Sequence, residues 1–176
     1  ERRRVKRKFP RSKLQVRLDT YEDNLKPEMT GIQRLDLHGL HISHRLSDRI
    51  WDMTKLQVLN LSHNLIPKLS PKVQYLIKLA DLDVSHNMLT SLPRKMEDLT
   101  QLKTFNASHN SLSSFTGFFF KCSRLESVDF SFNLFQKLPI VSGNLELLKA
   151  TKQWDVGIGV LKALRFLNLE GNKFTE

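Results

Sequence analysis

The chain is 176 residues long, carries a formal net charge of +10 at pH 7, and draws 40% of its residues from the hydrophobic types. This length is ample for one hydrophobic core, and no apolar run approaches the ~20 residues that a membrane-spanning helix needs. We therefore expect a folded domain without a membrane contact, and no secretory leader pattern is visible.

The N-terminal segment is the most basic part of the chain. Residues 1–30 contain ten Lys or Arg and five Asp or Glu. Six of the basic residues form an arm: Arg2, Arg3, Arg4, Lys6, Arg7 and Lys8. Such a run can be a nuclear-import signal, a phosphate-contacting arm or a solvated tail, and the sequence leaves these alternatives open. We assign residues 1–12 to this basic arm.

A strand-like cap is expected after the arm. Leu14, Val16 and Leu18 alternate with polar residues, which predicts a short strand that covers the edge of the next element. Residues 20–31 are rich in turn formers. The segment 13–31 is therefore predicted to be an N-terminal cap and its connection.

The rest of the chain, residues 32–176, is built from a repeated pattern. Five segments share the form LxxLxLxxNxL: residues 56–66, 79–89, 102–112, 125–135 and 164–174. The first four begin 23 residues apart. Residues 32–42 keep the apolar frame with Leu40 in the Asn position, and residues 145–155 are a weaker copy. We therefore predict about seven repeats, which start near 32, 56, 79, 102, 125, 145 and 164.

Each repeat has a direct physical interpretation. The LxL part has period two, so it predicts a short strand with its leucines inward, and stacked units share one core. The closing Asn can satisfy backbone groups where the chain leaves the strand: Asn64, Asn87, Asn110, Asn133 and Asn172. The pattern resembles the leucine-rich repeat family, which implies an α/β horseshoe solenoid with a parallel β-sheet on its concave face.

Aligning the return segments by repeat separates core from surface. Buried positions are predicted at Leu69, Leu92, Val73, Met96, Leu76, Leu99 and Cys122, among others. The neighbouring columns are polar in other repeats, so Trp51, Phe118 and Phe120 are predicted to be exposed on the convex side. They are candidate anchors for a partner, although single exposed aromatic residues are also common.

The concave face is the principal candidate binding surface. One outward column contains Asp36, Asn60, Asp83, Asn106 and Asp129, and a second contains His63, His86, His109 and Phe132. Three histidines raise the question of zinc, but ladder side chains project nearly parallel whereas zinc needs converging ligands. We expect solvated repeat residues or contacts to a protein partner, with no metal and no cofactor.

No catalytic motif stands out in the chain, so we expect no enzyme activity and no small-molecule substrate. The primary hypothesis is a protein-interaction module, an adaptor or substrate-recognition subunit. A phosphatase regulatory subunit or signalling scaffold is an alternative, and nucleic-acid binding would depend on the basic arm alone. A single cysteine favours an intracellular protein of the nucleus or cytoplasm.

Two finer resemblances bear on this hypothesis. The 23-residue units with Leu92-Pro93 and Leu138-Pro139 resemble intracellular Ras-pathway scaffolds. The basic segment Lys13 to Asp19 ahead of the repeats resembles the leucine-rich substrate receptor of a cullin-RING ubiquitin ligase that acts on the replicative helicase. The second resemblance implies a nuclear substrate receptor within a larger complex.

Overall fold

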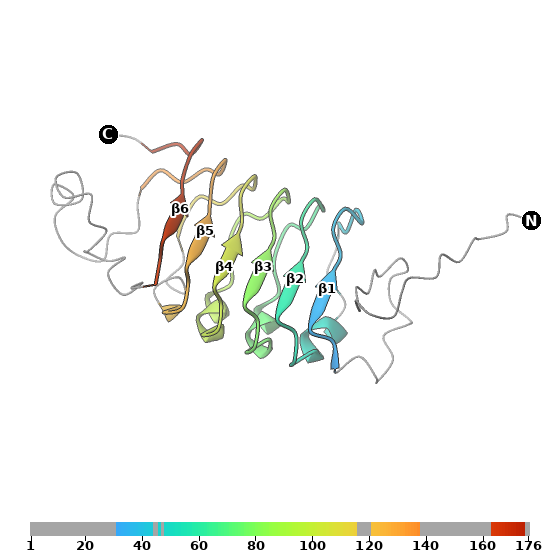
Figure 1. Cartoon of the computed structure of the whole chain (residues 1–176). Helices are drawn as coiled ribbons and strands as arrows, with labels where there is room; N and C mark the ends of the chain where they lie inside the picture. Colours follow the sequence, from blue (N-terminus) through green and yellow to red (C-terminus); the bar gives the residue numbers. More distant parts are fainter. Residues whose placement is uncertain (1–30, 44–45, 47, 116–120, 138–162, 175–176) are drawn as a thin grey trace, which may run out of the picture.

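The computed structural model describes residues 31–43, 46, 48–115, 121–137 and 163–174. Six short strands form one parallel sheet in the order β1-β2-β3-β4-β5-β6 (Figure 1). The strands are β1 (Arg34–Asp36), β2 (Val58–Asn60), β3 (Asp81–Asp83), β4 (Thr104–Asn106), β5 (Ser127–Asp129) and β6 (Phe166–Asn168). The predicted parallel sheet of stacked repeats is confirmed.

The register of the sheet follows the sequence repeat. Leu35, Leu59, Leu82, Phe105, Val128 and Leu167 are consecutive partners across the ladder. These central residues are buried from β1 to β5, and Leu167 in the last strand is half-buried. The two flanking residues of each strand are exposed or half-buried. The sheet therefore has one face in the core and one open face, the sheet face, which is the predicted concave surface.

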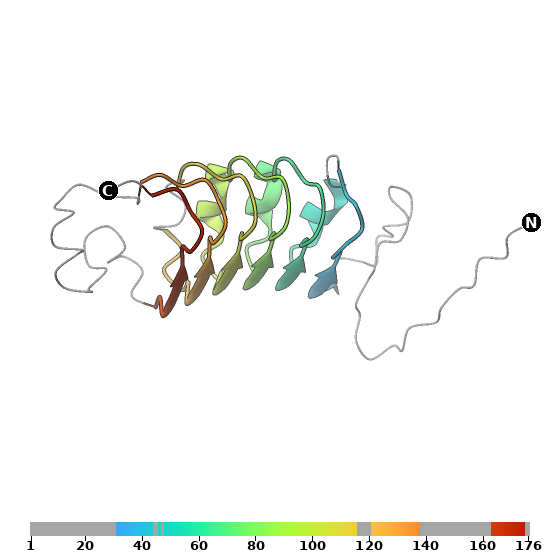
Figure 2. The ribbon, with the colours of Figure 1, turned by 90° about the horizontal axis from the view of Figure 1, so that it is seen from above.

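Short 3-10 turns lie on the opposite side of the stack from the strands (Figure 2). They are η2 (Asp48–Asp52), η3 (Pro71–Tyr75) and η4 (Arg94–Asp98). In η3, the Ser70 hydroxyl accepts a hydrogen bond from the Lys72 N–H, and Pro71 occupies the first turn, where no backbone donor is needed. The repeats that contain these three turns thus return compactly to the start of the next strand.

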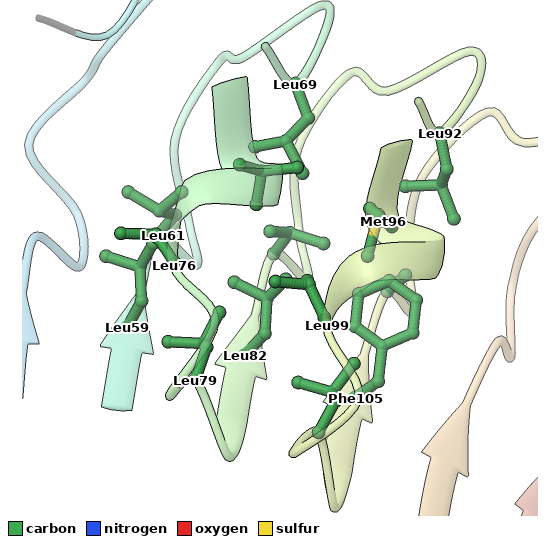
Figure 3. Close-up of a cluster of buried hydrophobic side chains, with 14 of the residues drawn as sticks. Leu59, Leu61, Leu69, Leu76, Leu79, Leu82, Leu92, Met96, Leu99 and Phe105 are labelled. Carbon is green, nitrogen blue, oxygen red and sulfur yellow. The ribbon is translucent and has the colours of Figure 1, made fainter. Parts of the chain in front are cut away.

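The core is a continuous apolar column between the sheet and the 3-10 turns (Figure 3). Side chains from successive repeats meet there, including Leu59, Leu61, Leu69, Leu76, Leu79, Leu82, Leu92, Met96, Leu99 and Phe105. The core positions named from the alignment are confirmed, and Phe115 in the same column as Leu69 and Leu92 is half-buried against the core. Cys122 is fully buried, and burial raises the pKa of its thiol to about 11, which suits a packing role.

An asparagine ladder closes the strands, as predicted. Asn110 is representative: its Nδ2 donates to the carbonyls of Val84, Ala107 and Ser108, and its Oδ1 accepts from the Leu89 N–H. Asn64, Asn87, Asn133 and Asn172 make equivalent bonds in their repeats. Each amide therefore joins its own turn to the preceding repeat and satisfies buried backbone groups.

The spacing between β5 and β6 corrects the sequence-based interpretation of the sixth repeat. β5 pairs directly with β6, and Val128 is the partner of Leu167, so no strand from residues 145–155 lies between them. The last two regular units start 39 residues apart, at Leu125 and Leu164, instead of 23. The hydrophobic pattern of residues 145–155 led to their interpretation as a repeat. Residues 138–162 themselves lie outside the described residues.

Trp51 was predicted to be exposed, and this prediction is wrong. Its side chain is only 1% exposed and is part of the core together with Ile50 and Leu46. The aligned polar residues Gln74 and Glu97 are half-buried, because long side chains can cover apolar surface while their polar ends reach water. Polar residues in a column therefore did not prove that the column faces solvent.

Candidate functional site

The sheet face carries a row of alternating Asp and Asn, one from each strand: Asp36, Asn60, Asp83, Asn106, Asp129 and Asn168. Each side chain accepts a hydrogen bond at Oδ1 from the backbone N–H two residues later, as Asp83 does from Ser85 at 2.9 Å. The Asp/Asn row therefore terminates every strand with an Asx turn.

The alternation also places a donor next to each acceptor. Asn168 Nδ2 donates to Asp129 Oδ2 at 3.2 Å, and Asn106 Nδ2 lies 3.5 Å from Asp83 Oδ2. Carboxylates thus occur on every second strand, which reduces their mutual repulsion. The flanking positions of the six strands carry four aspartates and one arginine. The open face is acidic although the whole chain is strongly basic.

A ladder of stacked rings runs beside this row, just beyond the ends of β2 to β5. The ring ladder comprises His63, His86, His109 and Phe132, with ring centroids separated by 4.0, 4.1 and 4.4 Å and planes within 14° of parallel. All four side chains are exposed. His38 meets the first ring edge-on at 4.9 Å. The structure therefore brings the predicted concave residues together in two adjacent rows.

The ladder residues share an unusual backbone conformation. His63, His86, His109 and Phe132 have φ between 51° and 54°. Gly39 and Gly171 adopt φ of 67° at the equivalent places in the first and last repeats. A left-handed non-glycine residue costs about 1–2 kcal/mol, whereas a stacked ring pair returns ~0.5–1.5 kcal/mol. Stacking therefore offsets only part of the backbone strain.

An apolar column that was not predicted from the sequence lies on the outer side of the ladder, at the position after each closing Asn. Leu65 and Met88 are 45% and 55% exposed, and Ser111 and Leu134 occupy the same position in the next two repeats. We call these four residues the rim column. The sequence could have revealed this column, because apolar residues follow the closing Asn at a position that is otherwise polar. The open surface thus combines carboxylates, rings and aliphatic side chains.

The electrostatics of the ladder centre on His86. Its pKa lies below the usual 6.5 because neighbouring groups shield the ring from water and because His63 and His109 would repel a second positive charge. Asp83 opposes this shift. The lowered pKa favours the neutral form of His86 at physiological pH, with one donor and one acceptor nitrogen.

Acid should weaken the fold through this residue. Because the pKa of His86 is lower in the folded chain than in the unfolded one, the unfolded chain binds more protons below pH 6.5. The stabilisation is therefore complete above pH 6.5 and is lost as the pH falls below that value. Thermal unfolding at about pH 7.5 and about pH 5.5 should show a smaller loss in His86→Asn than in the natural chain. His41→Asn is the matched control, since His41 is also left-handed but lies outside the ladder; an equal response of both variants would contradict this account.

Several other predicted site residues cannot be placed. Phe118, Phe120 and the arm residues Arg2, Arg3, Arg4, Lys6, Arg7 and Lys8 lie outside the described residues, as does the predicted cap at 13–30. Within the described ranges, no group of three or more His, Cys, Asp or Glu is placed to hold a metal ion. No helix in those ranges is long and apolar enough to cross a bilayer.

Comparison with known proteins agrees with the repeat geometry. The model of the leucine rich repeat family matches residues 54–112. Residues 54–112 thus resemble the leucine-rich repeat family, and the stacked parallel sheet has the fold of a leucine-rich repeat solenoid. A Leptospira interrogans leucine-rich repeat protein superposes with a TM-score of 0.69 and 25% identity, covering 81% of this chain and 32% of that chain. The present solenoid therefore spans about a third of the length of that protein.

Other solved structures share the fold at lower identity. The ectodomain of the receptor kinase SOBIR1 from Arabidopsis thaliana gives a TM-score of 0.61 at 23% identity, over 81% of this chain and 71% of that one. Internalin C2 from Listeria monocytogenes gives 0.60 at 22%, over 80% and 52%. No curated protein matches the chain. Leucine-rich repeat domains in general mediate protein–protein interaction.

Proposed function

We propose that this leucine-rich repeat domain is a non-catalytic recognition module that holds a protein partner on its sheet face. The observation that carries the proposal is the open face itself, where carboxylates, rings and aliphatic side chains from successive repeats form one continuous surface. A mixture of charged, aromatic and aliphatic groups is typical of protein interfaces. Away from the sheet face, exposed apolar residues of the described ranges include Tyr75 and Ile77.

Within this role, we propose an adaptor or substrate-recognition subunit of a larger complex. The resemblance to a cullin-RING substrate receptor supports this form, and the signalling-scaffold and phosphatase-subunit forms remain its alternatives. The single cysteine supports a location in the nucleus or cytoplasm. Nucleic-acid binding would need the basic arm, since the acidic sheet face is unsuited to phosphate groups.

The proposal is tested by blocking the sheet face without altering its turns. Val58 and Ser127 are half-buried, outward-facing strand residues. In the double variant Val58→Arg and Ser127→Arg, two long side chains obstruct the surface. The association of a partner recovered by cross-linking and then purified should weaken by about tenfold or more, as expected for the centre of an interface.

Tyr75→Arg is the control on the opposite side of the solenoid, because Tyr75 is 52% exposed in η3. Its affinity for the same purified partner should match that of the natural chain. Unaltered binding by the sheet-face variant, together with loss of binding by Tyr75→Arg, would place the interface on the convex side. Melting temperatures of all variants establish that the fold is intact.

A further inference from the structure

The edge of the sheet face where the strands end combines three parallel rows that differ in chemistry. Nearest the strands lies the Asp/Asn row, next the ring ladder, and then the rim column with exposed Leu65 and Met88. All three run across the strands, so a ligand that uses them together must lie perpendicular to the strands. Such a ligand is elongated and passes over several repeats.

The spacing of the carboxylates limits the conformation of this ligand. Asp36, Asp83 and Asp129 lie on β1, β3 and β5, two strands apart in each case. With strands ~4.7–4.9 Å apart, successive carboxylates are separated by roughly 9–10 Å. A polyproline II helix rises ~3.1 Å per residue and has three residues per turn, so every third side chain returns to the same side after about 9.3 Å. An extended β-strand does not meet this condition, because its side chains alternate with period two.

The ring ladder fits the same type of ligand. Polyproline II segments dock in grooves lined by aromatic side chains, which pack against their proline rings. The backbone at the ladder position is left-handed, a conformation that glycine adopts without strain. Four consecutive repeats nevertheless have a ring-bearing residue there. All four rings are exposed, so they are accessible to the proline rings of such a segment.

We propose that this edge binds a polyproline II segment of a partner protein that carries Arg or Lys at every third residue. This inference rests on the proposed function and specifies its partner. The cationic side chains donate to the carboxylates of the Asp/Asn row, and the intervening residues lie on the ring ladder and the rim column. Guanidinium groups suit these sites best, since they bind carboxylates with two parallel hydrogen bonds.

The carboxylates keep capacity for such bonds. At Asp83 and Asp129, Oδ1 is used by the Asx turn, and Oδ2 receives one contact from a neighbouring Asn, at 3.5 and 3.2 Å. Each carboxylate oxygen can accept more than one hydrogen bond. A cationic ligand therefore binds without breaking the turns that terminate the strands.

Protonation of the ladder opposes the binding of a cationic segment. The groups that face His86 are His63 from the repeat of β2, His109 from that of β4, and Asp83 from its own strand. The lowered pKa of His86 favours its neutral form at neutral pH, where the neighbouring carboxylates attract a cationic ligand. Acidification protonates His86 and places a positive charge beside Asp83, which weakens this attraction.

The test uses the full chain and three fluorescently labelled peptides of equal length. The probe repeats Arg-Pro-Pro three times, the second peptide has the same composition with its three arginines contiguous, and the third has Glu in place of Arg. Fluorescence anisotropy at low and physiological salt should show the probe binding at least about tenfold more tightly than the contiguous peptide, since only the probe aligns each charge with a carboxylate. The Glu peptide should not bind.

Variants then assign the binding to this edge. Asp83→Asn with Asp129→Asn should weaken the probe by about tenfold. Asn occupies the same place in neighbouring repeats, at Asn60 and Asn106, and accepts the same turn hydrogen bond, so these substitutions preserve the fold. Asp98→Asn removes one exposed carboxylate from η4 and should leave the affinity unchanged. Phe132→Gly removes a ring where glycine tolerates the backbone and should weaken binding severalfold.

Two outcomes would overturn the inference. Equal binding of the probe and the contiguous peptide would show that only charge attracts the ligand, and no binding of any peptide would exclude the class. Neither result would contradict the proposed function. That function is tested separately, by the binding of a natural partner to the Val58→Arg and Ser127→Arg variant. The pH arm adds a third criterion: acidification to about pH 5.5 should weaken binding of the probe to the natural chain, and should weaken it less in His86→Asn.

Discussion

Replacing Leu82 with alanine is expected to destabilise the solenoid by about 2–5 kcal/mol. Leu82 is the central residue of β3 and is 2% exposed, with Leu59 and Phe105 as its partners on the adjacent strands. Truncation leaves a cavity in the middle of the stack, where neighbours on both sides are fixed by the sheet. Urea unfolding of the isolated chain, followed by circular dichroism, measures this loss.

Leu65→Ala is the matched control for this change. It is also a leucine of the repeat consensus region, but it is 45% exposed on the rim column. Its replacement should change the stability by no more than about 0.5 kcal/mol. If the two leucine variants were equally stable, the inward and outward positions of the strand would have been assigned incorrectly.

The regular part of the fold was predictable because one spacing determines it. A 23-residue period aligns Leu59 with Leu82 and Phe105, and the structure pairs these residues in the sheet. Likewise, an amide can donate and accept, so Asn64 and its equivalents were expected to satisfy the turn. These features need only local geometry repeated many times.

The sequence pattern could not decide whether residues 145–155 add a strand between β5 and β6. Residues 145–155 have leucines at suitable intervals, and a weak repeat pattern cannot distinguish a strand in the sheet from a segment outside it. Only the direct pairing of β5 with β6 decides between them. The prediction for Trp51 was wrong because the aligned polar residues Gln74 and Glu97 suggested a solvent-facing position, although both are half-buried in the structure.

The residues of the candidate site were predicted from the sequence, but their geometry was not. The concave columns containing Asp83 and His86 were identified, whereas their hydrogen bonds and ring stacking were not. The glycine at position 39 was a signal for a left-handed backbone, because glycine at one end of a column indicates a conformation that its other members must also adopt. Ring stacking then follows because the same backbone conformation recurs at this position in successive repeats.

Removing a central amide of the asparagine ladder is expected to have the second large effect. In Asn110→Ala, the buried Leu89 N–H loses its acceptor, and the carbonyls of Val84 and Ala107 lose one of their donors. An unsatisfied buried polar group costs about 1–3 kcal/mol, and the cavity adds to it, so we expect a total loss of roughly 2–4 kcal/mol. Asn172→Ala should cost less, because Asn172 is only half-buried in the last described repeat and water can replace its bonds.

Asn110→Asp separates the two functions of the amide. The carboxylate can still accept from the Leu89 N–H, but it faces the carbonyl oxygens of Val84 and Ala107 where the amide had donated. This repulsion and the burial of charge raise the pKa of the new carboxyl above its unfolded value. The variant should therefore be least stable at neutral pH and should regain stability as the pH falls and the carboxyl becomes a donor, whereas Asn110→Ala should show no such recovery. Urea midpoints at about pH 7 and about pH 4.5, each relative to the natural chain, provide the measurement. Parallel behaviour of the two variants would mean that the donor half of the ladder contributes little to the fold.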